Sequence, residues 1–349
     1  MHIPLYTITP SILSTISKIA EIKAVVGKTP LLPQRELFLR RWAHIRITHT
    51  STRIEGNTLD EFQVQQVSEG KPVRADKKHI TEVQNYLAGL RLIDRLNEKK
   101  KQIETKDIFL VHRTVMRGLI ESVKSGALRF KPAYIVNVNQ KGVETLVYTP
   151  PPARKVPILI GEVLLWLQTS DEHPIIRAGL FHYLFETIHP FADGNGRTGR
   201  LLTLLHLYQS EWDFRRLLVL EDYYNEDREK YFVALQTGKT YDSRRNADLT
   251  FWLTYYVKGF LHEAQKVQQQ ILGMQGVGKS PVVPRHLTND ELRMVDFALS
   301  LGKMTSQDVV DMLMIPKRTA QSRLRKLVEM KILQPHGAAR ATYYTVAMP

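Results

Sequence analysis

Apolar residues recur at three- and four-residue spacing along most of the chain, as on one face of an α-helix. This pattern covers the segments 11–26, 36–54, 61–104, 107–123, 156–167, 177–188, 221–235 and 249–271. Between Gly126 and Pro152 the pattern changes, because Tyr134–Val138 and Val143–Tyr148 alternate as two short strands around a turn. We therefore predict a mainly α-helical protein with one β-hairpin.

A loop rich in glycine separates two of these helical segments. It is His-Pro-Phe-Ala-Asp-Gly-Asn-Gly-Arg-Thr-Gly-Arg, from His189 to Arg200. Gly194 and Gly196 can both take positive φ and direct their N–H groups toward one point. An apolar run begins at Leu201, so the loop should lie at a helix N-terminus, where free N–H groups and the macrodipole favour an anion. The loop is predicted to bind phosphate.

The side chains of the same loop favour phosphoryl chemistry. Arg197 and Arg200 are three residues apart, hence on one helical face, and two guanidinium groups suit a polyphosphate. Asp193 offers the hard oxygen ligand that Mg²⁺ takes beside substrate phosphates. His189 is a candidate general base, since imidazole accepts a proton near neutral pH. Each feature alone is usually structural, and their occurrence together indicates a catalytic site.

This stretch resembles the signature of the Fic/Doc family, His-x-Phe-x-Asp/Glu-Gly-Asn-Gly-Arg-x-x-Arg, and the resemblance covers most of residues 1 to about 265. It implies the Fic fold, a helical bundle with a β-hairpin flap, and transfer of AMP from ATP to a Ser, Thr or Tyr hydroxyl of a target protein. In that reaction His189 is the base and Asp193 holds Mg²⁺. The implied ATP-binding residues are Gly194, Asn195, Gly196, Arg197, Thr198, Gly199 and Arg200.

A second stretch, Ser51-Thr-Arg-Ile-Glu55-Gly56-Asn57, ends the helical segment 36–54. Taken alone, Glu55 is most simply a solvated carboxylate near a helix end. Beside the motif, the stretch resembles the inhibitory helix of the family, Ser/Thr-x-x-x-Glu-Gly/Asn, in the group where this helix precedes the catalytic domain. The resemblance implies that Ser51, Glu55 and Gly56 form an autoinhibitory element and that Glu55 pairs with Arg200. In some relatives the same glutamate supports removal of AMP.

Two further sites follow from the resemblance, each with a structural alternative. The hairpin resembles the Fic flap, on which a target segment pairs by β-augmentation, and Val136 and Asn137 are candidate contacts for nucleotide or target. Without that context, the hairpin is a structural excursion. Tyr231 and Phe232 occupy positions where relatives place two tyrosines near the adenine, but core aromatics are the simpler interpretation.

The amino-acid composition limits the classes of function that the protein can have. The chain has 349 residues, 43% of them hydrophobic, and its net charge is 49 minus 35, or +14, which favours acidic partners. The chain contains no cysteine, so disulfides and thiol catalysis are excluded. We find neither a secretory signal nor a long apolar run, and expect a cytoplasmic protein without a membrane partner. A second copy of the chain is a further candidate partner.

The C-terminal part contains a misleading motif and a separate module. Gly273–Ser280 matches a Walker A loop, but no strand precedes it and Pro281 follows, so we interpret 272–284 as a linker. Residues 285–349 resemble a winged helix-turn-helix whose third helix is basic, with ten Lys/Arg against six Asp/Glu in the module. Its partner is DNA or another protein. The predicted divisions are therefore 1–104, 105–271, 272–284 and 285–349.

The sequence leaves three functions open. The first is the protein adenylyltransferase, autoinhibited by Glu55. The second is a phosphodiesterase that removes AMP from proteins. The third is a DNA-binding transcription regulator in which the Fic-like part only senses nucleotide. The target protein, its acceptor residue, the physiological nucleotide and what relieves the inhibition are not determined by sequence.

Overall fold

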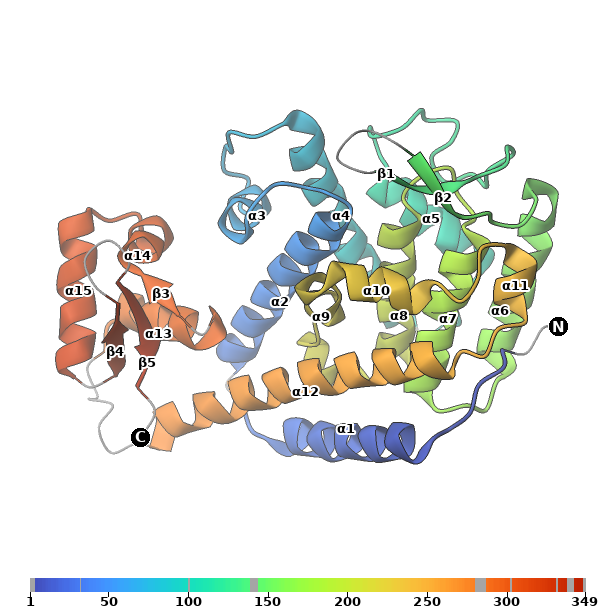
Figure 1. Cartoon of the computed structure of the whole chain (residues 1–349). Coiled ribbons are helices and arrows are strands. Elements are labelled where there is room, and N and C mark those ends of the chain that lie inside the picture. Colours follow the sequence, from blue (N-terminus) through green and yellow to red (C-terminus); the bar gives the residue numbers. More distant parts are fainter. Residues whose placement is uncertain are drawn as a thin grey trace. The chain divides into compact units, whose positions relative to one another are not determined.

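The computed structural model describes residues 4–31, 33–99, 101–138, 144–279, 287–301, 303–330, 332–337 and 342–347 (Figure 1). It divides into two compact units, one comprising Met1–Ala24 and Ala43–Gln265, the other Val25–Trp42 and Lys266–Pro349. The division runs through three long helices, which are α1 (Pro10–Lys28), α2 (Pro33–Ile54) and α12 (Thr250–Lys279). Most described residues are helical, as the spacing of apolar residues predicts.

The first unit is organised around α8 (Asn195–Gln209), which packs against α4 (Lys77–Glu98), α5 (Thr105–Val115) and α7 (Pro174–Ile188) (Figure 1). Leucines line α8 on all sides and are buried, as expected for a helix enclosed by others. Gly89 lets α4 approach α8 closely, because a Cβ at this position would collide with the Leu201 side chain. The catalytic motif therefore begins a helix that its neighbours hold in place.

The helices of the first unit differ from the sequence prediction at several ends. The predicted segment 61–104 forms two helices, α3 (Glu61–Ser68) and α4, and Asp60 and Gln63 form a reciprocal capping box at the start of α3. The predicted helix 107–123 ends early, because α5 stops at Val115. The predicted helix 221–235 is broken at Asp227, whose side chain caps α10 by accepting from Lys230 N at 2.9 Å. Two helices result, α9 (Leu220–Glu226) and α10 (Arg228–Leu235).

Four further elements complete this unit: η1 (Ala153–Lys155), α6 (Val156–Thr169), η2 (Phe214–Arg216) and α11 (Tyr241–Arg245). The closing helix α12 continues past the predicted end, Ile271, as far as Lys279. Residues 273–279 are therefore helical, which excludes a phosphate-binding Walker A loop there. The remainder of the predicted linker, 280–284, lies outside the described residues.

The predicted hairpin is present as β1 (Ile135–Val138) and β2 (Glu144–Tyr148), which pair antiparallel with Val136 opposite Leu146 and Asn137 opposite Thr145. Its base is fixed to the helical core. The Tyr148 hydroxyl donates to the Thr187 carbonyl at 2.7 Å, and the Arg244 guanidinium lies 3.5 Å from the centre of the Tyr148 ring. This anchoring provides the core contact that an isolated two-stranded hairpin lacks.

The second unit contains a small module with a helix, a short strand, two helices and two strands. These are α13 (Asn289–Leu301), β3 (Met304–Thr305), α14 (Ser306–Leu313), α15 (Lys317–Glu329), β4 (Leu333–His336) and β5 (Tyr343–Val346). The three strands form an antiparallel sheet in the order β3-β5-β4. Thr305 and Asp308 form a capping box that starts α14 directly after β3. Over the described ranges, no helix combines the length and apolar character needed to cross a bilayer.

Candidate active site

The motif loop connects α7 to α8, and two of its residues have left-handed backbone. His189 follows the last residue of α7 with φ 50° and ψ 63°, and Gly194 precedes α8 with φ 78°. Left-handed backbone is uncommon for a residue with a Cβ, and His189 is one of the residues that adopt it here. A Cβ at Gly194 would also collide with the Met116 side chain, which leaves no space for another residue.

The prediction of positive φ at Gly196 is wrong. Gly196 lies within the first turn of α8 and has helical backbone, so only Gly194 has the left-handed conformation in this part of the loop. The reason for glycine at position 196 is crowding from outside the helix. A Cβ there would meet Oε1 of Glu55 and Nη1 of Arg200. This glycine therefore makes room for the carboxylate of the residue that follows α2.

Two polar side chains predicted to bind nucleotide hold the loop together. The Asn195 amide accepts from Phe191 N at 2.8 Å and donates to the Phe191 carbonyl at 2.9 Å. The Thr198 hydroxyl donates to the Gly194 carbonyl at 2.8 Å. Both side chains are buried, so their first role in this structure is to fix the shape of the loop.

His112 of α5 supports the loop from beneath, and sequence reasoning missed it. Its ring stacks on Phe191 with centroids 3.7 Å apart, and its Nδ1 accepts from Gly126 N at 2.9 Å. The proton must then reside on Nε2, which donates to the Asp193 carbonyl at 2.9 Å. Burial lowers the pKa of His112 to about 4 and keeps it neutral. A single histidine on a predicted core helix offers no sequence signal for this role.

The catalytic candidate His189 is held by its backbone. Arg129 Nε donates to the His189 carbonyl at 2.8 Å, and Arg129 Nη2 donates to the Pro151 carbonyl at 2.5 Å. One buried arginine thus joins the histidine to the segment after β2. The imidazole Nδ1 is buried, and the backbone of Glu186 acts on the ring as a hydrogen-bond acceptor. Burial lowers the pKa of His189 to about 4, so its ring is neutral and can accept a proton at pH 7.

Asp193 is the most accessible polar side chain of the motif, with 59% of its surface exposed. Its Oδ1 accepts from Gly194 N at 2.5 Å and lies 3.5 Å from Arg197 Nη2. An exposed carboxylate at the mouth of an anion-binding loop is the donor that Mg²⁺ takes beside phosphates. Asp193 therefore fits the predicted metal role.

The two arginines of the motif have different surroundings. Arg197 is buried between Asp193 and Glu82 of α4, and its Nη1 lies 3.5 Å from Glu82 Oε1. Glu82 also accepts from the amide of Asn57 at 2.8 Å, which ties the residues after Glu55 to the same network. Sequence reasoning did not identify Glu82. Arg197 enters the site already paired with carboxylates.

Arg200 is bound to the end of α2. Its Nη2 donates to Glu55 Oε1 at 2.8 Å and to the Ser51 carbonyl at 3.0 Å, and its Nε donates to Ser51 Oγ at 2.7 Å. Gly56 then turns the chain away with φ 96°. Burial of Glu55 favours the neutral acid, but the charges of Arg200 and Arg197 outweigh it and lower the pKa of Glu55. Ser51, Glu55 and Gly56 thus lie where the resemblance places an inhibitory element.

A second carboxylate near this pair was not predicted. Glu186 of α7 lies against Gly199, where a Cβ would be 2.8 Å from Glu186 Oε1, so this glycine allows the carboxyl group to approach α8. That oxygen is buried without a hydrogen-bond partner in the part of the chain that the structure describes. Burial raises the pKa of Glu186 to about 7, although the charge of Arg200 acts in the opposite direction.

The remaining predicted site residues lie on α10 and on the hairpin. Tyr231 is buried, its hydroxyl lies 2.8 Å from His182 Nε2, and its ring stacks on Tyr224, which is the core arrangement. Phe232 is 41% exposed and Val136 37% exposed, so both can meet a ligand. Asn137 has a described backbone in β1, and its side chain lies outside the described part of the structure.

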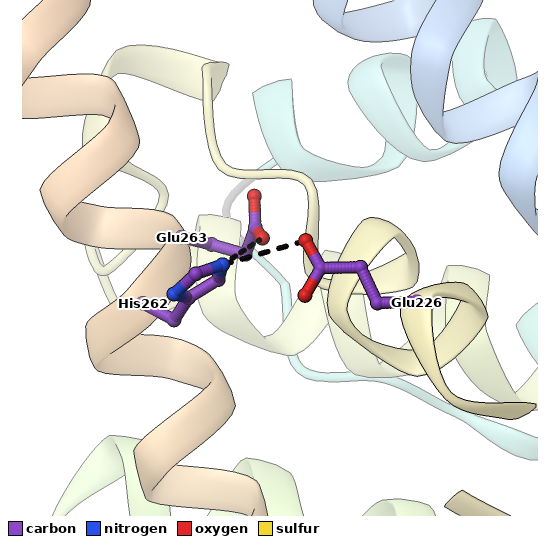
Figure 2. A group of neighbouring side chains, drawn as sticks. All are labelled: Glu226, His262 and Glu263. Carbon is purple, nitrogen blue, oxygen red and sulfur yellow. Dashed lines mark hydrogen bonds and ion pairs between the residues drawn. The ribbon is translucent and has the colours of Figure 1, made fainter.

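A second group of potential metal ligands lies on other elements. Figure 2 shows His262 of α12 between Glu226 of α9 and Glu263, with His262 Nε2 at 3.4 and 3.9 Å from the two carboxylates. The charge of Glu263 also acts on a neighbouring arginine, Arg46. Burial disfavours the charge of Arg46, but the carboxylates of Asp222 and Glu263 outweigh this effect and raise the pKa of Arg46. Both glutamates, Glu226 and Glu263, also interact with residues outside this group. We interpret the group as ion pairing between helices.

Comparison with known proteins agrees with this geometry. The model of the Fic/DOC family matches residues 102–207. The chain carries a Fic/DOC family domain. It is 29% identical over 230 residues to the protein adenylyltransferase Fic of Aedes aegypti, covering 61% of this chain and 42% of that protein. Identity to the protein adenylyltransferase Fic of Drosophila virilis is 32% over 169 residues, covering 47% and 32%.

Solved structures extend the likeness beyond the domain. A Fic family protein from Desulfovibrio desulfuricans matches with a TM-score of 0.67 and 28% identity, covering 100% of this chain and 99% of that chain. Fic-1 from C. elegans matches with a TM-score of 0.60 and 23% identity, covering 77% and 73%. The Fic fold is therefore confirmed. The chain spans less than half the length of the two insect adenylyltransferases that it matches.

Proposed function

We propose that this protein is a protein adenylyltransferase that transfers AMP from ATP to a Ser, Thr or Tyr hydroxyl of a target protein. The observation that carries the proposal is the placement of one neutral imidazole, one exposed carboxylate and two arginines around a single loop, at His189, Asp193, Arg197 and Arg200. The similarity to insect protein adenylyltransferases supports it.

In this reaction the ATP phosphates bind at the start of α8. The His189 imidazole accepts the proton of the target hydroxyl, whose oxygen attacks the α-phosphorus. The bond from the α-phosphorus to the bridging oxygen breaks, and pyrophosphate leaves. Asp193 would hold Mg²⁺, which when bound would neutralise the charge on the phosphates. Arg197 and Arg200 position the β- and γ-phosphates, and N–H groups of the first turn of α8 stabilise the transferring group.

The nucleotide in this pose competes with Glu55. Its carboxylate occupies the Arg200 guanidinium that would otherwise bind the γ-phosphate, and its negative charge repels that phosphate. The enzyme is therefore autoinhibited while α2 keeps this position. The edge of the flap, at Val136 and Asn137, aligns the target segment by main-chain pairing.

One observation favours a second candidate, removal of AMP from a modified protein. Glu55 is an ionised carboxylate beside the motif, since its pKa is lowered, and a carboxylate there could activate a water. Transfer and removal differ in their need for Glu55. Removal requires the carboxylate, whereas transfer requires its withdrawal.

The experiment compares wild type, His189→Ala and Glu55→Gly with ATP labelled at the α-phosphate, in a lysate and with the purified protein alone. Transfer predicts labelling that is strongest for Glu55→Gly and absent for His189→Ala. Release of AMP from prelabelled protein by wild type, lost in Glu55→Gly, would favour removal. If none of the three proteins adds or removes label, the adenylyltransferase proposal is wrong.

A further inference from the structure

We propose that the module from α13 to β5 is a winged helix that binds duplex DNA through one face of α15. The first step is the orientation of this helix. Ala320, Leu324 and Leu327 are fully buried and share one face. At 100° per residue, the opposite face carries Arg318, Ser322, Arg325 and Glu329, and all four are exposed.

The structure separates the basic residues of α15 into two groups. Arg323 Nη1 lies 2.5 Å from Asp290 Oδ2, and Lys326 Nζ lies 2.7 Å from Glu291 Oε1. Both pairs join one flank of α15 to the start of α13, so these cations are occupied within the fold. Lys317, Arg318 and Arg325 are exposed, and none of them forms an ion pair with another residue that the structure describes. The sequence, in which all five are equivalent, does not make this distinction.

The outer face has the chemistry of a DNA-reading helix. Arginine binds phosphate or the guanine edge with two parallel hydrogen bonds, and serine can donate to either. Lys317 and Arg318 lie in the first turn of α15, the part of a recognition helix that contacts bases. Arg325 lies two turns further along the same outer face, where it can meet a phosphate, and the acidic Glu329 is the last residue of α15. In the module, α15 follows α13, β3 and α14 and precedes β4 and β5, and this arrangement leaves the outer face of α15 at the surface.

A protein partner fits the same face less well. Interfaces between proteins have a central group of apolar and aromatic side chains, and the outer face of α15 carries none. Met314, in the turn before α15, is 76% exposed, but single apolar side chains are common on protein surfaces. The charge of the outer face is therefore matched by phosphates.

The test uses the full chain and a fluorescein-labelled duplex of about 30 base pairs with random sequence, with binding measured from about 50 to 300 mM salt. We expect log Kd to depend linearly on log salt concentration. Arg318→Ala and Arg325→Ala should each weaken binding about fivefold and reduce the slope by about one. A preferred sequence is then sought by selection from a randomised duplex pool.

Arg323→Ala is the matched control, because it removes the same charge two residues away on the same helix. Its partner Asp290 is 40% exposed and can be solvated, so the loss should cost little stability. Arg323→Ala should leave the slope unchanged. AMP transfer should be equal in all these variants, so failure of DNA binding is distinguishable from failure of the proposed enzyme.

Three results would overturn the inference. The first is no duplex binding by wild type at about 50 mM salt. The second is equal effects of Arg323→Ala and Arg325→Ala, which would indicate only a general electrostatic attraction. The third is a protein partner whose capture depends on Arg318 and Arg325 while duplex DNA fails to compete for it.

Discussion

Arg200 donates to Glu55 at 2.8 Å across 145 residues of sequence. The arginine lies in the second turn of α8 and the glutamate is the residue after α2, so this contact, together with the bonds from Arg200 to Ser51, joins the motif to the end of α2. Because Arg200 is 3% exposed, its charge needs an anionic partner, and either Glu55 or a phosphate can supply it. The exchange of one for the other is the basis of the first prediction.

Glu55→Gln should raise AMP transfer about tenfold or more, because the amide is similar in size but no longer repels the γ-phosphate. The same change should lower the free energy of unfolding by about 1–3 kcal/mol without nucleotide, since the buried guanidinium of Arg200 loses the opposite charge of Glu55. Labelling with α-labelled ATP and thermal unfolding measure the two effects. Glu98→Gln, at an exposed position of α4, is the control and should change neither. Faster transfer without loss of stability would contradict this account.

The pH dependence of transfer should reflect the buried state of His189. Its pKa is lowered to about 4 from 6.5, so the ring remains neutral and able to accept a proton well below pH 6.5. With the activated variant Glu55→Gly, kcat/KM, which reports ionisation of the free enzyme, should lose the contribution of His189 only as the pH approaches about 4. A pH–rate profile with an acid limb near 6.5 would show that His189 titrates as an exposed imidazole.

Glu186→Gln should raise stability at high pH and have less effect at low pH. The folded-state pKa of Glu186 is raised to about 7 from 4.5, so the folded state binds more protons than the unfolded chain between these values. Stability from this group is therefore present below pH 4.5 and is lost as the pH rises through 7. We expect the Tm of Glu186→Gln to exceed that of wild type by about 2 °C or more at pH 8, and the difference to shrink at pH 4.5. A difference that does not change with pH would contradict the role of burial.

His112→Ala should weaken Mg²⁺ binding more than it weakens the fold. The ring holds the Asp193 carbonyl and supports Phe191, so its loss should raise the Mg²⁺ concentration for half-maximal transfer about tenfold. His206→Ala provides the control, because His206 is a buried histidine of α8 whose Nε2 has no hydrogen-bond partner among described residues. That control should lower the Tm and leave the Mg²⁺ dependence unchanged. Equal Mg²⁺ dependence in the two variants would exclude the positioning role of His112.

The sequence by itself determined the helical architecture, the hairpin and the motif, because these depend on local signals. Apolar spacing predicts the helices, alternation predicts β1 and β2, and the glycine at position 194 indicates the left-handed turn that begins α8. It also placed the catalytic candidates His189 and Asp193, since they are close in sequence. The sequence prediction for Gly196 was wrong, because glycine is needed there to make room for Glu55, the residue after α2, and not for a positive φ.

Only the tertiary structure decided which groups from distant segments surround that motif. Four of these groups come from segments whose sequences show ordinary core or surface patterns: His112, Glu82, Arg129 and Glu186. Their roles arise from the hydrogen bonds and burial that packing creates. The same holds for α15, where the partners Asp290 and Glu291 on α13 distinguish the two cations that are paired within the fold from those without an ion pair among the described residues. Local spacing specifies a helix face, whereas the free energy of a buried charge depends on the partner that the fold places beside it.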